Sequence, residues 1–285
     1  MEISSGSKTF ITGAPYRASD SSKFSAADLS LKIHISSAQI AYLISEKKNR
    51  RVLCLQPYQN PSSTKEQSAT KFLESVLSED ELLKNLFSER QIGILTPDFT
   101  LLPKEFSDSH LSDQWKKKFT QQKNSSVLCA DQIEDMNLEV DFVVPTQVIN
   151  LLEDILKKYK LHHSITNQIR TLASRNQGRA VYCTVQSGFL QVIYLDSGQL
   201  MFANIFQYQS AEDFIYFLLA VYNQHHLDPE NVKVVLLGEI MKDSAMFQLV
   251  YKYIRNIEFG KPSAQWKFDD DYPFPPHFYF SLLCS

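Results

Sequence analysis

The sequence is poor in glycine, with only 8 glycines in 285 residues. Phosphate-binding loops use glycine where backbone N–H groups must approach a ligand closely, so this scarcity argues against a glycine-lined nucleotide site. The chain also lacks a strong charge of one sign, since its formal net charge is −3. No global field then favours nucleic acid or an anionic membrane surface. We therefore expect no nucleic-acid partner.

Long apolar runs are missing as well. No window approaches the roughly 18 apolar residues that span a bilayer, and the stretch 1–24 has no apolar core of signal-peptide length. None of the cysteines lies within a few residues of another, which excludes zinc-type spacing. They are Cys54, Cys129, Cys183 and Cys284. The sequence predicts a cytoplasmic protein with reduced thiols, without a metal and without membrane insertion.

What the chain does contain is the same pattern twice. LKIHISSAQIAYLI (Leu31–Ile44) aligns with VYCTVQSGFLQVIY (Val181–Tyr194), and each copy continues with a third strand-like segment, a helix and a further strand. The repeat predicts an α/β protein built by duplication, with two mixed-sheet domains and flanking helices. We place the domains at 24–160 and 161–285, after a polar, weakly ordered arm at 1–23.

Alternation of apolar and polar residues locates the first strand. Leu31 and Ile33 are expected on its buried face, and Lys32 and His34 on its outer face. Further predicted strands are 40–44, 52–55, 91–97, 140–145, 181–185, 190–194, 200–204, 232–238 and a terminal one at 278–284. Predicted helices follow Pro145, Ser210 and Ser244.

This duplicated order resembles the actin-like ATPase fold, a ribonuclease H-like architecture shared by actin, sugar kinases and the large heat-shock chaperones. In that superfamily the first turn of each half reads apolar–Asp–apolar–Gly. The aspartates organise Mg²⁺ and the attacking water, and the glycine lets backbone N–H groups touch a phosphate. The matching tetrapeptides here are Ile33–Ser36 and Cys183–Gln186. Both aspartates and both glycines are replaced.

A third element of the superfamily is a strand that ends in two glycines, against which the adenosine lies. Its equivalent here, Leu236–Ala245, keeps Gly238 and continues with Glu239. The resemblance therefore implies the fold with degenerate nucleotide motifs. If a nucleotide still binds, hydroxyls and backbone N–H groups would hold its phosphates without aspartate. The residues at these positions are Ser36, Ser37, Thr184, Ser187 and Gly238.

The layout also resembles an uncharacterised bacterial family, the domain of unknown function 3822, which is assigned an actin-like ATPase fold. Three motifs carry this resemblance: TPDFTLLPKEF (Thr96–Phe106), VVPTQ (Val143–Gln147) and FPPHFYF (Phe274–Phe280). It covers the chain from about residue 24 to the end. Its motifs are structural, so the resemblance implies a fold and no chemistry.

Other candidate sites each have a simpler interpretation. His34 could bind an anion or act as a base, yet its position fits an outward strand residue. The histidine pairs 162–163 and 225–226 point to opposite faces, and the acidic run 269–271 fits an exposed turn. A nuclease would use Asp141, Asp196 and Glu239, but it needs an acid where His34 stands. The basic and aromatic segment 115–123 has the character of a single-strand binding surface, but so short a run is more typical of a solvated loop.

Two main hypotheses follow, from different classes. The first is a non-catalytic, cytoplasmic scaffold that binds an unknown protein partner through the interdomain cleft or an exposed helix face. The alternative is a divergent nucleotide-binding protein or kinase that uses the cleft for ATP. A nucleic-acid-binding module is a weaker third, and its affinity would fall steeply with salt.

Overall fold

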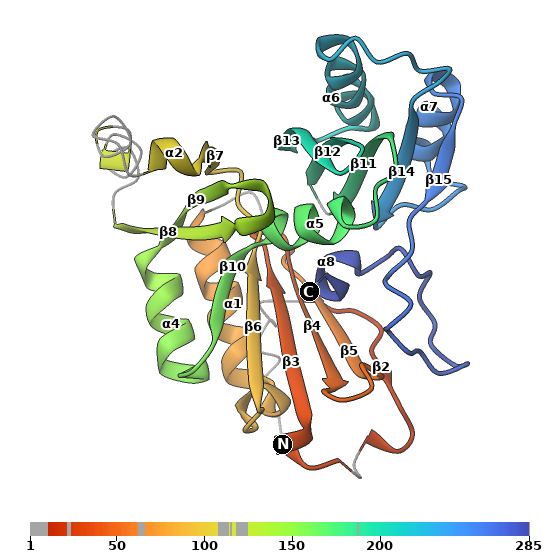
Figure 1. Ribbon diagram of the computed structural model, residues 1–285. Helices are drawn as coiled ribbons and strands as arrows, with labels where there is room; N and C mark the ends of the chain where they lie inside the picture. Colours follow the sequence, from red (N-terminus) through yellow and green to blue (C-terminus); the bar gives the residue numbers. More distant parts are fainter. Residues whose placement is uncertain are drawn as a thin grey trace.

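A computed structural model of the protein describes residues 11–21, 24–61, 66–107, 114, 116–117, 125–186 and 188–284. Two large sheets and a small one make up the molecule, with helices on the outer faces of the large sheets (Figure 1). Ser187 and most of the predicted basic loop 115–123 lie outside the described residues.

The first sheet has three antiparallel strands, as the repeat predicts, and then two strands that run parallel to the first of them. Its strands are β3 (Leu29–Ile35), β4 (Gln39–Glu46), β5 (Val52–Gln59), β6 (Glu89–Ile94) and β10 (Lys160–His163), with β1 (Ile11–Thr12) and β2 (Tyr16–Arg17) against β5. β6 and β10 run parallel to β3, in the order β5–β4–β3–β6–β10. The boundary predicted at 160/161 therefore falls within β10, a strand of this sheet.

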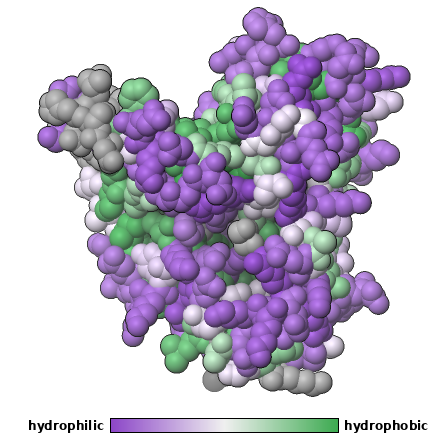
Figure 2. Space-filling view, in the orientation of Figure 1, coloured by the Kyte–Doolittle hydropathy of each residue, from purple (hydrophilic) through white to green (hydrophobic). Residues whose placement is uncertain are grey.

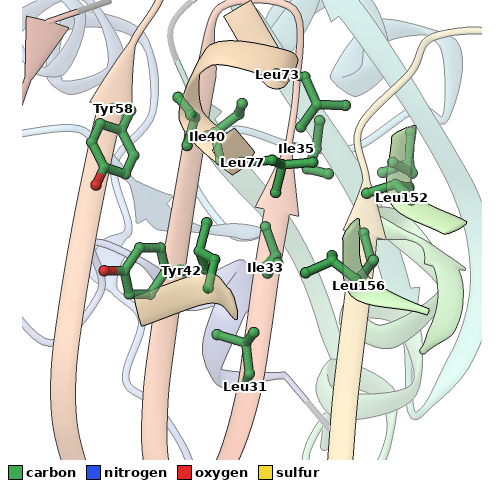
Figure 3. Close-up of a cluster of buried hydrophobic side chains, with 14 of the residues drawn as sticks. Leu31, Ile33, Ile35, Ile40, Tyr42, Tyr58, Leu73, Leu77, Leu152 and Leu156 are labelled. Atoms are coloured by element: carbon green, nitrogen blue, oxygen red, sulfur yellow. The ribbon is translucent and has the colours of Figure 1, made fainter. Parts of the chain in front are cut away.

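Helices cover one face of the first sheet and close an apolar core. They are α1 (Glu66–Glu79) and α4 (Thr146–Leu156), the latter starting directly after Pro145 as predicted. Figure 3 shows side chains from β3, β4 and β5 meeting Leu73 and Leu77 of α1 and Leu152 and Leu156 of α4. Leu31 and Ile33 lie in this core as the alternation predicts.

The second sheet repeats the strand order of the first. Its strands are β11 (Arg179–Gln186), β12 (Phe189–Asp196), β13 (Gln199–Gln207), β14 (Lys233–Gly238) and β15 (Ile257–Phe259), in the order β13–β12–β11–β14–β15. The helices α6 (Ala211–Gln224) and α7 (Ala245–Tyr253) pack on it through a second apolar core. Ser210 and Ser244 cap these helices by accepting backbone N–H groups of their first turns.

A small third sheet is inserted into the first half, between β6 and α4. Its strands β7 (Phe99–Pro103), β9 (Leu138–Pro145) and β8 (Ser126–Ile133) pair antiparallel in that order, and α2 (Lys104–Ser107) follows β7. The described part of the first half also contains three short 3₁₀ helices, Ala26–Asp28, Glu81–Lys84 and Glu134–Met136.

Between the two large sheets lie two helices that join the halves (Figure 1). They are α5 (Ser164–Ala173), for which no element was predicted, and α8 (Phe280–Leu283). The predicted strand at 278–284 is wrong, because the last carbonyls bond to side chains instead of a neighbouring strand. Lys32 Nζ donates to the Cys284 carbonyl at 2.9 Å, and Trp266 Nε1 donates to that of Leu283 at 2.7 Å.

Part of the predicted N-terminal arm is ordered as strand. Residues 11–17 run antiparallel to β5, and Tyr16 is buried among apolar side chains while its hydroxyl donates to Asp269 at 3.0 Å. Arg51 binds the carboxylates of both Asp20 and Asp269. The arm and the C-terminal segment thus hold each other on the first sheet.

Candidate functional site

The first of the two turns that would face a phosphate joins β3 to β4, and its polar groups bond one another. Ser36 N–H donates to the Gln39 carbonyl at 2.8 Å, and the Ser36 hydroxyl accepts the Gln39 N–H at 2.9 Å. The same hydroxyl lies 3.0 Å from the Gln39 carbonyl. The carbonyl of Ser37 accepts the Asn60 side chain at 2.8 Å. The polar groups of Ser36 are therefore used within the turn.

The second turn joins β11 to β12, and its predicted hydroxyl is also engaged. Thr184 is buried on β11, and its Oγ1 donates to Gln168 Oε1 of α5 at 2.6 Å. Ser187, the other predicted residue of this turn, lies outside the described residues. The structure thus places Thr184 in the junction between the halves, with a protein partner for its hydroxyl.

Gly238 ends β14 and lies against backbone. Its φ is +78°, and a Cβ added there would stand 2.0 Å from the Val185 carbonyl oxygen. Its N–H donates to the His277 carbonyl at 2.7 Å, and the next N–H, of Glu239, donates to Val185 at 2.7 Å. The glycine lets β14 approach β11 closely, so the contact that the resemblance assigns to adenosine is made by the protein itself.

Buried neutral side chains join the two turns through α5. His34 Nε2 lies 2.9 Å from Ser164 Oγ, and Gln186 Nε2 lies 3.5 Å from His34 Nδ1. Gln191 Nε2 donates to Gln186 Oε1 at 3.2 Å. Gln168 Nε2 donates to Gln191 Oε1 at 3.1 Å and approaches Ser164 Oγ at 3.4 Å. We call this set the interdomain network: His34, Ser164, Gln168, Thr184, Gln186 and Gln191.

The prediction that Lys32 and His34 face outward is wrong. Their side chains are 9% and 3% exposed, because α5 and α8 cover this face of the first sheet. Burial lowers the pKa of His34 to about 4, and His163 adds to the effect. His34 is therefore neutral near pH 7, and the interdomain network carries no charge. Burial also lowers the pKa of Lys32, to about 8.

A small pocket lies beside the interdomain network. It is lined by Lys32 and His34 of β3, Gly93 of β6, Ser164 of α5 and Ser281 of α8, among others, and has room for about one water molecule. Ligand sites for drug-sized molecules are larger by an order of magnitude or more. The helix α8 forms one wall, so this part of the chain closes the junction.

One carboxylate at the junction is that of Glu239. Gln39 Nε2 donates to its Oε1, and burial raises its pKa. This bond connects the first turn to the end of β14 and so links the halves a second time. No group of three potential metal ligands gathers anywhere in the described part of the chain. The fold family implies Mg²⁺ and ATP here, but the residues present do not fit them.

The remaining candidate site residues lie in different parts of the molecule and do not form a common site. His163 is buried and bonds the Thr96 carbonyl at 3.0 Å, whereas His162 contacts Asp131 at 3.1 Å. Asp269 is held by Arg51. The nuclease set is dispersed, since Asp141 lies on the small sheet and Asp196 and Glu239 lie at opposite ends of the second one.

Sequence reasoning missed the contribution of α5. Ser164 and Gln168 are buried polar residues with no motif of their own. A signal for the helix was present, since Ile165, Ile169 and Leu172 recur at helical spacing and are buried. Nothing in that spacing shows that Gln168 would bond residues of the second sheet.

The fold and the altered junction define a protein of the actin-like ATPase fold. A Bacteroides thetaiotaomicron protein of that fold and of unknown function is 19% identical, with a TM-score of 0.71 over 85% of this chain and 93% of that one. The PilM–PilN type IV pilus biogenesis complex contains a chain that is 12% identical, with a TM-score of 0.53 over 90% and 97%. None of the curated proteins matches the sequence.

The family itself is shown by its sequence model. The chain belongs to the family described as protein of unknown function (DUF3822), whose model matches residues 19–257. This confirms the predicted membership and the predicted fold. Among the described residues, no helix is both long and apolar enough to span a membrane.

Proposed function

We propose that the protein is a non-catalytic, cytoplasmic partner-binding scaffold of the actin-like ATPase fold. The observation that carries the proposal is the interdomain network, in which neutral side chains bond one another where the fold family would place Mg²⁺ and phosphates. A phosphate there would have to displace these bonds and would meet no aspartate-held cation.

A scaffold role agrees with the use of this fold in assemblies. PilM, a structural neighbour, occurs in a complex with PilN. In this chain the halves are joined by the interdomain network, by Gln39 with Glu239 and by α8. A molecule fixed in this way would present constant surfaces to a protein partner. The predicted duplication is supported by the strand order that both sheets share.

The alternative, a divergent nucleotide-binding protein or kinase, has one observation in its favour. A buried cation, Lys32, lines the small pocket next to His34. Its ammonium group now donates to the Cys284 carbonyl. A nucleotide would therefore require α8 to leave, and its phosphates would then use Ser36, Ser37, Thr184, Ser187 and Gly238 as predicted.

Calorimetric titration with ATP and ADP, with and without Mg²⁺, tests the proposal. We expect no heat and no thermal stabilisation up to millimolar nucleotide. A dissociation constant in the micromolar range would mean about 8 kcal/mol of binding free energy and would favour the alternative. Steady ATP turnover that is lost in Thr184→Ala and kept in the control Thr100→Ala, on β7, would overturn the scaffold proposal.

A further inference from the structure

The strand β13 forms an open edge of the second sheet. It pairs with β12 on one side, and no strand of the described residues pairs with it on the other. Its sequence, QLMFANIFQ (Gln199–Gln207), contains no charged residue, proline or glycine. Proteins usually protect exposed edge strands with charged residues, proline or a β-bulge, because open backbone groups invite another strand. The one irregularity in the pairing of β13 lies near its start, at Met201, so the stretch from Phe202 to Gln207 lacks that protection.

The pairing with β12 shows which groups face the open side. The Tyr208 N–H donates to the Gly188 carbonyl at 3.1 Å, and bonds alternate along an antiparallel pair. The backbone groups of Ala203, Ile205 and Gln207 are therefore directed to the open edge. An independent contact agrees, because the Ile205 N–H is bonded by the side chain of its own neighbour, Asn204, at 2.8 Å.

The first half shows which kind of segment pairs with the edge strand that corresponds to β13. There β5 occupies the place of β13 in the shared strand order, and its outer side is paired. The occupant is an extended segment, Ile11–Arg17, which runs antiparallel to β5 through β1 and β2. The second half has the same edge, and no strand of the described chain pairs with it.

Apolar side chains and a hollow accompany this edge. Met201 is 50% exposed, and Phe206 stacks on Phe217 of α6 with ring centroids 4.7 Å apart. Tyr216, in contact with Phe217, is 67% exposed. Figure 2 shows a hollow between the part of the molecule that carries α6 and β13 and the part that carries α2 and β7 (compare Figure 1).

We propose that β13 is a docking edge for an extended, uncharged segment of a partner protein, which pairs antiparallel to β13 as Ile11–Arg17 pairs with β5. The inference rests on the proposed partner-binding function and names the site. Main-chain bonds to Ala203, Ile205 and Gln207 would hold the segment, and its apolar side chains would contact Met201 and Phe206. Asn204 would release the Ile205 N–H on binding.

The hollow beside β13 favours a single strand as the occupant of the edge over a second copy of this chain. The wall that carries α2 and β7 stands opposite the edge (Figure 1). A second copy would have to extend its whole sheet and helices towards that wall, whereas one strand adds about 4.8 Å to a sheet. The uncharged sequence of β13 also requires no compensating charge on the occupant.

Selection from a phage-displayed library of random dodecapeptides on the full-length protein tests the proposal. We expect enrichment of peptides with alternating apolar residues and no net charge, whose synthetic forms bind with micromolar dissociation constants. Binding should weaken at least tenfold in Ala203→Pro, which removes an edge N–H, and in Met201→Lys, which adds a charge to the edge. The matched control is Met241→Lys, whose methionine is 46% exposed and lies off the edge.

Two outcomes would overturn the docking edge. One is the absence of enriched peptides, or peptides whose binding is the same in Met201→Lys and Met241→Lys. The other is a wild-type dimer in sedimentation velocity that Met201→Lys dissociates, since the occupant would then be a second copy. Failure of the proposed function is recognised separately, because ATP binding and turnover are measured on the unmodified protein without peptide.

Discussion

The outer layers of this molecule and the junction between its halves differ in how many buried polar side chains they contain. Each outer layer packs helices on a sheet through fully buried apolar side chains, among them Leu77 of α1 and Leu218 of α6. The junction combines an apolar cluster, to which α5 contributes Ile165 and Ile169 and α8 contributes Phe280, with a buried network of amides, hydroxyls and an imidazole. Apolar packing supplies most of the stability of a domain, whereas satisfied polar networks fix one arrangement of the parts.

The two faces of β3 show the same difference within one strand. Leu31 and Ile33 enter the apolar core beneath α1, and Lys32 and His34 enter the junction. All four are buried. The strand therefore serves an ordinary core on one face and, on the other, the polar contact that joins the halves. Breaking each region by substitution should give different effects.

Truncation of the outer layers should have the largest effect. Leu77→Ala and Leu218→Ala each remove a fully buried side chain and leave a cavity, so each should lower the free energy of unfolding by about 2–5 kcal/mol. Denaturant titration measures this loss. The exposed Leu86→Ala is the control and should change it by less than about 0.5 kcal/mol. A loss below about 1 kcal/mol at both core positions would contradict the assignment of the cores.

Gly238→Ala should destabilise the junction by straining the backbone at residue 238. The positive φ costs about 1–2 kcal/mol for a residue with a Cβ, and the clash with Val185 adds about 1–3 kcal/mol. We expect a total loss of about 2–5 kcal/mol in unfolding free energy. Gly188→Ala separates the two causes, because its φ is +76° and its Cβ would meet nothing within 4 Å. Equal losses in both variants would show that the contact with Val185 is not tight.

The charge state of His34 gives the junction a pH dependence. Its pKa is about 4 in the folded protein and about 6.5 when unfolded, so between these values the unfolded chain binds more protons. Stability should therefore fall as the pH drops from 6.5 to 4, by up to about 3 kcal/mol from this group. His163, also near 4, acts in the same direction. Asp141, whose pKa burial raises to about 6, opposes them.

His34→Gln should flatten this dependence because it keeps a polar side chain and removes the titration. Unfolding titrations at several pH values between 4 and 7 measure the slope. His226→Gln, at an exposed position, is the control and should retain the slope of the wild type. If His34→Gln also retains it, His34 is not buried in the neutral form.

The sequence predicted the core residues of the outer layers better than it predicted the residues of the junction. Alternation along β3 places Leu31 and Ile33 in the core because a half-buried strand repeats every second residue. The same alternation misplaces Lys32 and His34, because their burial depends on α5 and α8, which are distant along the chain. The alternation of residues along β3 cannot show that the helices at 164–173 and 280–283 pack on its other face.

The positions at which the superfamily's aspartates and glycines are replaced correctly located the two turns of the junction. The tetrapeptides Ile33–Ser36 and Cys183–Gln186 mark the two turns that the structure brings to the junction. That Thr184 bonds Gln168 could not be predicted, because a glutamine in a helix has no sequence signature for such a role. The terminal helix was missed because residues 278–284 are apolar in a strand-like way, and the side chains that bind its last two carbonyls, Lys32 and Trp266, lie outside this segment.

The smallest expected effect on stability, and the sharpest local one, concerns Lys32. Its ammonium group holds the Cys284 carbonyl and lies 5.0 Å from the Trp266 ring centre. Lys32→Met keeps the aliphatic stem but loses a charged hydrogen bond, worth about 1.5–3 kcal/mol. It also removes the cost of burying the cation, so the net change in unfolding free energy should be within about 1 kcal/mol. Amide hydrogen exchange should nevertheless become faster in α8.

The pH dependence of Lys32→Met separates these contributions. In the wild type the pKa of Lys32 is about 8 when folded and about 10.5 when unfolded, so the unfolded chain binds more protons between these values. The contribution of Lys32 to stability should therefore rise with pH from 8 to 10.5, and Lys32→Met should lack this rise. Lys252→Met, which removes an exposed lysine over Tyr253, should leave both the rise and the exchange of α8 unchanged. An unchanged exchange rate in Lys32→Met would mean that apolar packing alone holds α8 at the junction.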